Sequence, residues 1–323
     1  MFLEILFLII GLALLVKGSD LTVDASKALS KKYRLSHTAL GLTLVSVGTS
    51  LPEITTNIYV GTRMSAGTDV SGIAVGLIIG SQITQITLIL GTAALIGTMY
   101  AKSHTFRREI PMLFVALGAL WLSAIDGFVH PIEALVLVLI YMGYLYFVNT
   151  HHNMTNNIKH EIKHKNQKHI SASKQMAIAI VGLLLLVLGG KLVVDNAEAL
   201  AAEFRVSQSL IGILIIGPGA ALPELSVAVS GMRKKASGIS LGALLGSNIT
   251  DPLLSFGLGA TIAGYSFEEN LLWFDMPFWL MATAIAALFI WTGRRIGRKN
   301  PLEGLVLVAI FGIFVMLKLF MFH

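Results

Sequence analysis

Cysteine is absent from this sequence of 323 residues, and charged residues are scarce. Without cysteine the chain has no disulfide bond, no thiolate metal site and no cysteine nucleophile. Charged residues make up 13% of the chain and hydrophobic residues 55%, whereas soluble proteins carry about 25% charged residues. This composition excludes a water-soluble fold and indicates a polytopic membrane protein. The net charge of +6 is therefore a topology signal and not a sign of a nucleic-acid partner.

Motifs of nucleotide-dependent and hydrolytic chemistry are missing too. The chain contains no GxxxxGKS or GxxxxGKT phosphate-binding loop, so ATP is not expected to drive it. No GxGD sequence accompanies any of its aspartates. We expect a protein that is not an enzyme and that carries no cofactor.

Long apolar runs are plentiful. A membrane-spanning helix needs about 20 mainly apolar residues, and ten such runs are present. The first run has no basic leader and no small-residue cleavage site, so we expect it to be retained as a helix. The runs predict an all-α membrane protein with ten transmembrane helices, over residues 2–17, 38–60, 71–99, 109–125, 129–149, 174–194, 207–230, 238–264, 271–292 and 302–321.

Lysine and arginine are distributed unevenly among the loops between these runs. Of the 24 such residues, four lie on one side of the predicted membrane: Arg63, Lys191, Arg205 and Lys318. All the others lie in the alternate loops, which the positive-inside rule places in the cytoplasm. We therefore expect both termini outside the cell and the loop between the fifth and sixth runs in the cytoplasm.

That loop, residues 150–173, is a polar linker rich in histidine and lysine. It separates a first half, residues 1–149, from a second half, residues 174–323. His160 and His164 are spaced to share a helical face, which would suit a metal or pH sensor. A solvated linker is the alternative interpretation, and the sequence favours it.

The two halves are related to each other in sequence. GLALLVKG at 11–18 corresponds to GLLLLVLG at 182–189, and further identities occur at the same spacing of 171 residues. They are Asp24 with Asp195, Arg34 with Arg205, Ser36 with Ser207, Gly41 with Gly212, Pro52 with Pro223 and Glu53 with Glu224. Beyond them the spacing becomes 166, and Gly80-Ser81 corresponds to Gly246-Ser247. Because each half has an odd number of runs, the copies cross the membrane in opposite directions, as inverted five-helix repeats. Such repeats are typical of transporters with an ion site near the midplane.

Three carboxylates lie in the middle of apolar runs, where ionisable residues are costly and usually functional. Glu53 ends the segment GTSLPE and Glu224 ends GAALPE, each directly after a proline that frees backbone carbonyls. The third is Asp251. In the run after each glutamate, polar residues four positions apart share a helical face. These pairs are Ser81 with Gln85 and Ser247 with Asp251.

The residues that would meet between the halves offer only oxygen ligands. Hard divalent cations take about six to eight oxygens, so calcium is the first choice, and magnesium and manganese remain open. Three carboxylates exceed the charge of one divalent ion, so an empty site would take up monovalent cations or protons. Competition for the same carboxylates is the physical basis of antiport. A cation channel and an intramembrane hydrolase with paired carboxylates are alternatives from other classes.

GTSLPE at 48–53 and GSNITD at 246–251 resemble the α-repeats of the cation/calcium antiporter superfamily, in particular the prokaryotic sodium/calcium exchangers. The resemblance covers the whole chain as five plus five helices and implies a prokaryotic cell membrane. It implies that Glu53 and Glu224 are the central calcium ligands, completed by Asp251 and Gln85. It further implies a flanking sodium site from Thr49, Ser50 and Ser81. The first and sixth runs would slide to alternate access.

Two departures from that family pattern concern the coupling ion. Gln85 stands where the family has asparagine, and it is one methylene longer. In the second half, Ala220 and Ala221 replace the threonine and serine of GTSLPE, which removes a hydroxyl expected to bind sodium. The divalent-ion assignment is less affected than the number of sodium ions, and proton coupling becomes an alternative. The sequence does not determine the oligomeric state.

Overall fold

The computed structural model describes residues 2–32, 47–100, 108–155, 171–233, 237–293, 295–296 and 301–321. The first half contains α1 (Phe2–Lys32), α3 (Leu51–Ser65), α4 (Ser71–Thr84), η1 (Gln85–Ile89), α5 (Leu90–Ile96), β1 (Met99–Tyr100), α6 (Ile110–Ser123), β2 (Phe128–Val129) and α7 (Pro131–Thr155). The second half contains α8 (Ala172–Phe204), α9 (Gln208–Ile211), η3 (Gly212–Ile216), α10 (Gly217–Ala220), α11 (Leu222–Arg233), α12 (Ser237–Thr250), η4 (Asp251–Ser255), α13 (Phe256–Ala263), β3 (Tyr265–Ser266), η5 (Leu271–Asp275), α14 (Met276–Gly293), β4 (Arg295–Ile296) and α15 (Pro301–Met321). The η segments are single π-helical turns.

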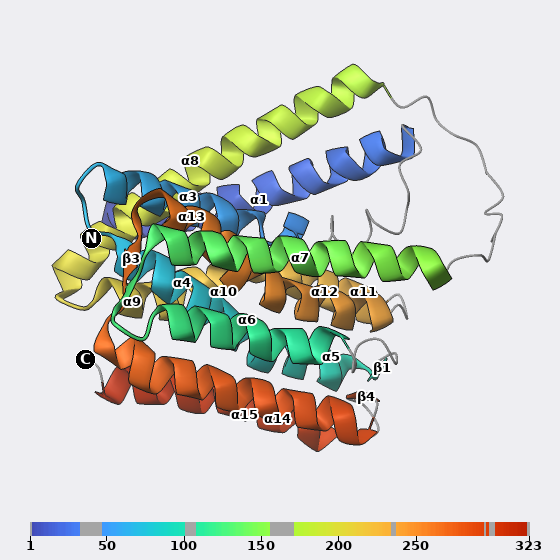
Figure 1. The fold of residues 1–323 in the computed structure, drawn as a ribbon. Helices are drawn as coiled ribbons and strands as arrows, with labels where there is room; N and C mark the ends of the chain where they lie inside the picture. The colour runs from blue at the N-terminus through green and yellow to red at the C-terminus, as the bar shows by residue number, and fades with distance from the viewer. Residues whose placement is uncertain are drawn as a thin grey trace.

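The chain is a helical bundle of a membrane protein (Figure 1). Within the described residues, seven helical stretches are long and apolar enough to cross a bilayer. The predicted run 38–60 lies partly outside the described residues, and α6 is a shorter apolar helix of 14 residues. Many large apolar side chains of α1, α7, α8 and α15 are exposed, as expected of helices that face lipid.

Helix ends differ most from the apolar runs in α1 and α8. α1 continues to Lys32 and α8 to Phe204, well beyond the predicted limits at residues 17 and 194. Hydropathy marks only the part of a helix that suits the hydrocarbon, whereas backbone hydrogen bonding continues through residues that favour helices, such as alanine and lysine. The run 207–230 is also interrupted, at Ala221.

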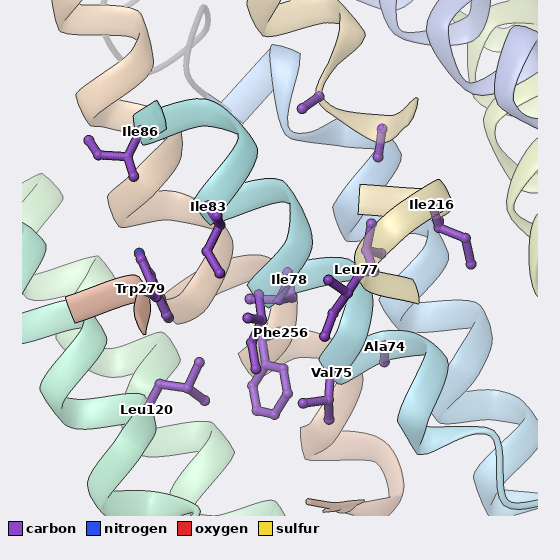
Figure 2. Packing of buried hydrophobic residues seen from close by; sticks show 14 of the residues in the cluster. Ala74, Val75, Leu77, Ile78, Ile83, Ile86, Leu120, Ile216, Phe256 and Trp279 are labelled. Atoms are coloured by element: carbon purple, nitrogen blue, oxygen red, sulfur yellow. The ribbon is translucent and has the colours of Figure 1, made fainter. Parts of the chain in front are cut away.

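The interior is built around α4, in which every residue is buried. Apolar side chains from several helices surround it, among them Leu120 of α6, Phe256 of α13 and Trp279 of α14 (Figure 2). Glycine permits close contact between α4 and η3: a Cβ on Gly212 of η3 would lie 2.8 Å from the Cα of Gly76. Small residues at such contacts allow helices to approach closely where lipid supplies no hydrophobic driving force.

α1 and α8 lie side by side along much of their length (Figure 1). A Cβ on Gly18 would lie 2.9 Å from the backbone nitrogen of Leu186, and a Cβ on Gly189 would lie 2.9 Å from that of Leu15. Gly18 and Gly189 are repeat-equivalent, and so are Leu15 and Leu186. The two contacts are therefore reciprocal, as they would be across a two-fold axis between the helices.

Short ladders join loops at the two ends of the bundle. β1 pairs antiparallel with β4, with Met99 opposite Ile296, and β2 pairs antiparallel with β3, with Val129 opposite Tyr265. The start of α1 and the end of α15 lie at one end of the molecule, which we call the terminal end (Figure 1). The end of α7 and the start of α8 lie at the opposite end, which we call the linker end (Figure 1).

Candidate cation site

Two glutamates lie at matching kinks in the chain. Ser50 precedes α3 with φ −79° and ψ 5°, and Ala221 precedes α11 with φ −77° and ψ 5°. In each helix a proline follows in the first turn, and Glu53 or Glu224 comes directly after it. The first turn of a helix carries partial positive charge from its unpaired N–H groups, which favours a carboxylate there. The repeated sequence thus produces the same local backbone twice.

The kink at Ser50 is linked to α1. Pro52 has no N–H to offer the carbonyl of Gly48, four residues before it. The hydroxyl of Ser19 in α1 donates to that carbonyl oxygen instead, at 2.7 Å. One of the two long helices is therefore bonded directly to the segment that carries Glu53.

The carboxylates of Glu53 and Glu224 are buried and unpaired. Glu53 is 0% exposed and Glu224 1% exposed. None of their four carboxylate oxygens has a hydrogen-bond partner among the described residues. Both interact electrostatically with Asp251, and Glu53 also with Glu224. Buried acidic groups without partners are costly in a membrane and point to a charged ligand.

Asp251 is held by a chain of amides. Its Oδ2 atom accepts hydrogen bonds from Nε2 of Gln82 at 2.8 Å and from Nε2 of Gln85 at 3.1 Å. Asn248 donates in turn to Oε1 of Gln85, at 2.9 Å. Ser255 donates to Oδ1 of Asp251 at 3.4 Å. Unlike the two glutamates, this carboxylate is already surrounded by donors.

π-Helical turns begin at the two central polar positions. η1 starts at Gln85 and η4 at Asp251, which are repeat-equivalent residues. Single π-helical turns inside α-helices frequently occur at functional sites, because the wider turn re-aims side chains and changes the backbone bonding.

Paired hydroxyls lie on one flank of the candidate site, beside Glu224, and the equivalent pair of positions in the repeat does not form the same bond. Thr49 and Ser247 share a hydrogen bond of 3.1 Å across the two halves, and both hydroxyls adjoin Glu224. The residues equivalent to this pair are Ala220, which has no hydroxyl, and Ser81, whose hydroxyl donates to the carbonyl of Ile78 at 3.0 Å. Ser50 is fully buried and adjoins Asp251.

The structure therefore brings most of the predicted residues together, with two qualifications. Ser81 is buried in α4, but its hydroxyl bonds to its own helix. Among the described residues no group of three His, Asp or Glu side chains is close enough to hold a metal ion directly. Asp251 faces amides, so the three carboxylates do not form a closed cage. The predicted linker histidines His160 and His164 lie outside the described residues.

Two residues that contact the site were not predicted from the sequence. Gln82 lies one turn before Gln85, and Ser19 lies in α1. The only signal for Gln82 was its repeat position, since it is equivalent to Asn248, a residue beside Asp251 in the same motif. Ser19 had no such signal, because its equivalent is Gly190.

A second polar cluster, away from the site, joins α3 to α8. Arg63 forms ion pairs with Asp195 and with Glu198, the latter at 2.8 Å. Tyr59 donates to Asp195 at 3.1 Å, and Lys191 pairs with the same carboxylate at 3.1 Å. We call these five residues the α3–α8 ion-pair cluster. It lies toward the terminal end of α8.

An apolar helical bundle with unpaired acids in its interior is the arrangement of membrane transporters for cations. The chain belongs to the sodium/calcium exchanger protein family, whose pattern it matches over residues 3–149 and 174–320. The resemblance seen in the sequence is thereby confirmed, and the family is one of transporters.

Individual relatives agree over nearly the whole chain. Inner membrane protein YrbG of Escherichia coli is 28% identical over 94% of this chain and 92% of its own length. Sodium/calcium exchanger MaX1 of Methanosarcina acetivorans is 27% identical over 96% of this chain and 97% of its own length. A solved structure of the sodium-calcium exchanger NCX_Mj, soaked with Na+ and Sr2+, has a TM-score of 0.65 and 28% identity, covering 98% of each chain.

Proposed function

We propose that this protein is a secondary antiporter that exchanges Ca2+ for Na+ across a prokaryotic cell membrane. The observation that carries the proposal is the set of four buried, unpaired oxygens on Glu53 and Glu224 in the bundle interior. Two such carboxylates match the charge of one divalent cation and suit the oxygen preference of calcium. The named functions of MaX1 and NCX_Mj support the same ions.

In this proposal Glu53 and Glu224 bind calcium from two matching helix starts, and Asp251 and Gln85 complete the centre. Thr49, Ser50 and Ser247 form a sodium site on the hydroxyl-bearing flank. Ser81 contributes there only if its hydroxyl leaves the carbonyl of Ile78. Sodium and calcium compete for the same acids, so their transport is coupled. Magnesium and manganese prefer similar ligands and are competitors to be tested.

The proposed architecture consists of ten transmembrane helices in two inverted repeats, residues 1–149 and 174–323, joined by the linker 150–173. The reciprocal glycine contacts of α1 and α8 support a pseudo-two-fold relation. Alternating access would come from sliding of these two helices against the rest, with the bond from Ser19 to Gly48 coupling α1 to the site. We place both termini outside the cell and the linker in the cytoplasm, from the distribution of lysine and arginine.

The direct test is uptake of radioactive calcium into proteoliposomes under an imposed sodium gradient and, separately, a proton gradient. We expect sodium to drive uptake in the unaltered protein. Glu53→Gln and Glu224→Gln keep side-chain size but remove the charge, and each is expected to abolish exchange. Glu269→Gln, at an exposed acid between α13 and η5, is the matched control and should retain activity. Undiminished exchange in both site variants would contradict the assignment.

Proton coupling is the second candidate. It is favoured by Ala220 and Ala221, both buried, which leave one flank without the hydroxyls that sodium would use. Uptake that follows the proton gradient and ignores sodium would establish it. Flux that needs no counter-ion would instead indicate a channel, because a channel requires no exchange.

A further inference from the structure

The side-chain amide of Gln82 donates a hydrogen bond through its N–H group, but its carbonyl oxygen accepts none from the described residues. Its side chain is 0% exposed, and its Nε2 donates to Oδ2 of Asp251 at 2.8 Å. Its Oε1 is buried and has no hydrogen-bond partner among the described residues. A buried amide oxygen without a partner costs about 1–3 kcal/mol, so its retention beside the carboxylate of Asp251 calls for a ligand.

The amides prevent a cation from reaching Oδ2 of Asp251 in the present arrangement. Both N–H donors on Oδ2 carry partial positive charge and occupy the positions from which a cation would approach. For Oδ2 to bind an ion, and so for both oxygens of Asp251 to bind one, at least one of these amides has to turn away.

Gln82 is the amide that is free to turn. Gln85 is restrained at both ends, since it donates to Asp251 while its oxygen accepts from Asn248. Asn248 is restrained too, because it also donates to the carbonyl of Leu244 at 2.9 Å. Rotation of the Gln82 amide breaks only its bond to Asp251, and it brings a carbonyl oxygen to the place where the N–H group was.

We propose that the Gln82 amide is a two-position group of the cation site. Without an ion it donates to Asp251. When a divalent cation binds, it turns and gives its carbonyl oxygen to the ion beside the carboxylate. Gln82 is thus a cation ligand supplied by α4, and it adds an oxygen to a site that lacks hydroxyls at Ala220 and Ala221. This inference rests on the proposed function of the same site.

The internal repeat explains why a glutamine is needed. The equivalent residue, Asn248, is one methylene shorter; it bonds to the carbonyl of its own helix four residues earlier and to the amide oxygen of Gln85, and to no carboxylate among the described residues. The longer side chain of Gln82 reaches across to Asp251 on the neighbouring helix.

The test compares Gln82→Met, which keeps length but loses both amide groups, with Gln82→Asn, which keeps the amide but shortens its reach. Gln208→Met is the control, because Gln208 donates to the carbonyl of Asp69 at the terminal end. The measurements are the KM and maximal rate of sodium-driven calcium uptake, the calcium-induced shift in Tm of the purified protein, and its calcium-induced infrared difference spectrum. The last two need no transport.

We expect Gln82→Met to raise the KM and the Kd for calcium by about two- to tenfold, the effect of losing one neutral oxygen partner, with a smaller change in maximal rate. Gln82→Asn should fall between this variant and the unaltered protein. Calcium should shift a side-chain amide carbonyl band that is missing from the Gln82→Met spectrum. If Gln82→Met folds poorly, Gln82→Leu replaces it, and KM and Kd still report on the folded fraction.

Two results would overturn the proposal: an unchanged KM and Kd for calcium in Gln82→Met, or the same amide carbonyl shift with and without Gln82. A protein that binds calcium but exchanges none would instead refute the proposed function, and the binding and infrared measurements would still decide the role of Gln82.

Discussion

Single residues distinguish the two kinks before α3 and α11, which have nearly the same backbone conformation. Ser50 and Ala221 have nearly the same φ and ψ, yet one carries a hydroxyl and the other a methyl group. Thr49 meets Ser247 at 3.1 Å, whereas its equivalent, Ala220, can form no such bond. The kink depends on the proline and the local helix geometry, so it is the same in both halves. At the kinks, the hydroxyl oxygens that could bind a cation are present only in the first half. The halves therefore share a frame and differ in chemistry.

A hydroxyl added to the apolar flank should strengthen sodium binding. We expect Ala221→Ser to lower the sodium concentration for half-maximal calcium efflux by about two- to tenfold, because it supplies one neutral oxygen. A single oxygen is a small addition to this buried position. The measurement is the sodium dependence of calcium efflux from vesicles.

The matched removal is Ser50→Ala, at the equivalent position of the first half. It should move the sodium dependence in the opposite direction while leaving the KM for calcium closer to its original value. A sodium dependence that neither substitution changes would show that these positions do not bind the coupling ion.

At the scale of elements, ion pairs join α8 to α3. Arg63 lies between Asp195 and Glu198, with Tyr59 and Lys191 beside the same aspartate. The Arg63 and Asp195 side chains are 25% and 32% exposed, whereas Lys191 is 57% exposed. Isolated exposed ion pairs contribute about 0–1 kcal/mol, but a network with one arginine between two acids contributes more.

A double-mutant cycle of Arg63→Gln and Asp195→Asn should therefore give a favourable coupling free energy of about 1 kcal/mol. Thermal unfolding in detergent, at low and high salt, measures it, and salt should reduce it. The pair of Lys191→Gln with Asp195→Asn is the control and should couple more weakly. Strict additivity for Arg63 and Asp195 at low salt would contradict the interpretation.

The sequence was most informative where an apolar run and the internal repeat pointed to the same positions. The paired glutamates and Asp251 could be selected from the sequence as candidate site residues, because acids at matching positions in apolar runs are costly to retain without an ion to bind. Gln82 could not, since a buried glutamine looks the same in a sequence whether it bonds its own helix or a neighbour. The bond of Thr49 to Ser247 joins the two halves, and only the packing of the helices brings them together. The extension of α1 to Lys32 was missed because hydropathy does not report helices beyond the bilayer.

At the scale of the whole molecule, the absence of cysteine makes the predicted topology directly testable. A single cysteine at His160, in the linker, should react with a membrane-impermeant thiol reagent only in inverted vesicles. A single cysteine introduced as Ala66→Cys, at an exposed position between α3 and α4, should react only in intact cells, because this loop lies at the terminal end with the chain ends (Figure 1). No native thiol competes in either case. The reverse pattern of labelling would invert the proposed orientation, and labelling from one side at both positions would refute the span count.

The α3–α8 ion-pair cluster also makes the two faces of the protein unequal. One repeat away in the sequence, Lys27 stands in place of Glu198 and Ser230 in place of Tyr59, so the second half does not repeat the residues of this cluster. A carrier with two identical halves would adopt its inward-facing and outward-facing states equally when empty. We expect unequal halves to give the empty protein a preference for one of the two states. Ion gradients alone still set the direction of net transport. The unequal ends should appear as different apparent affinities for the same ion when it is offered from the inside and from the outside.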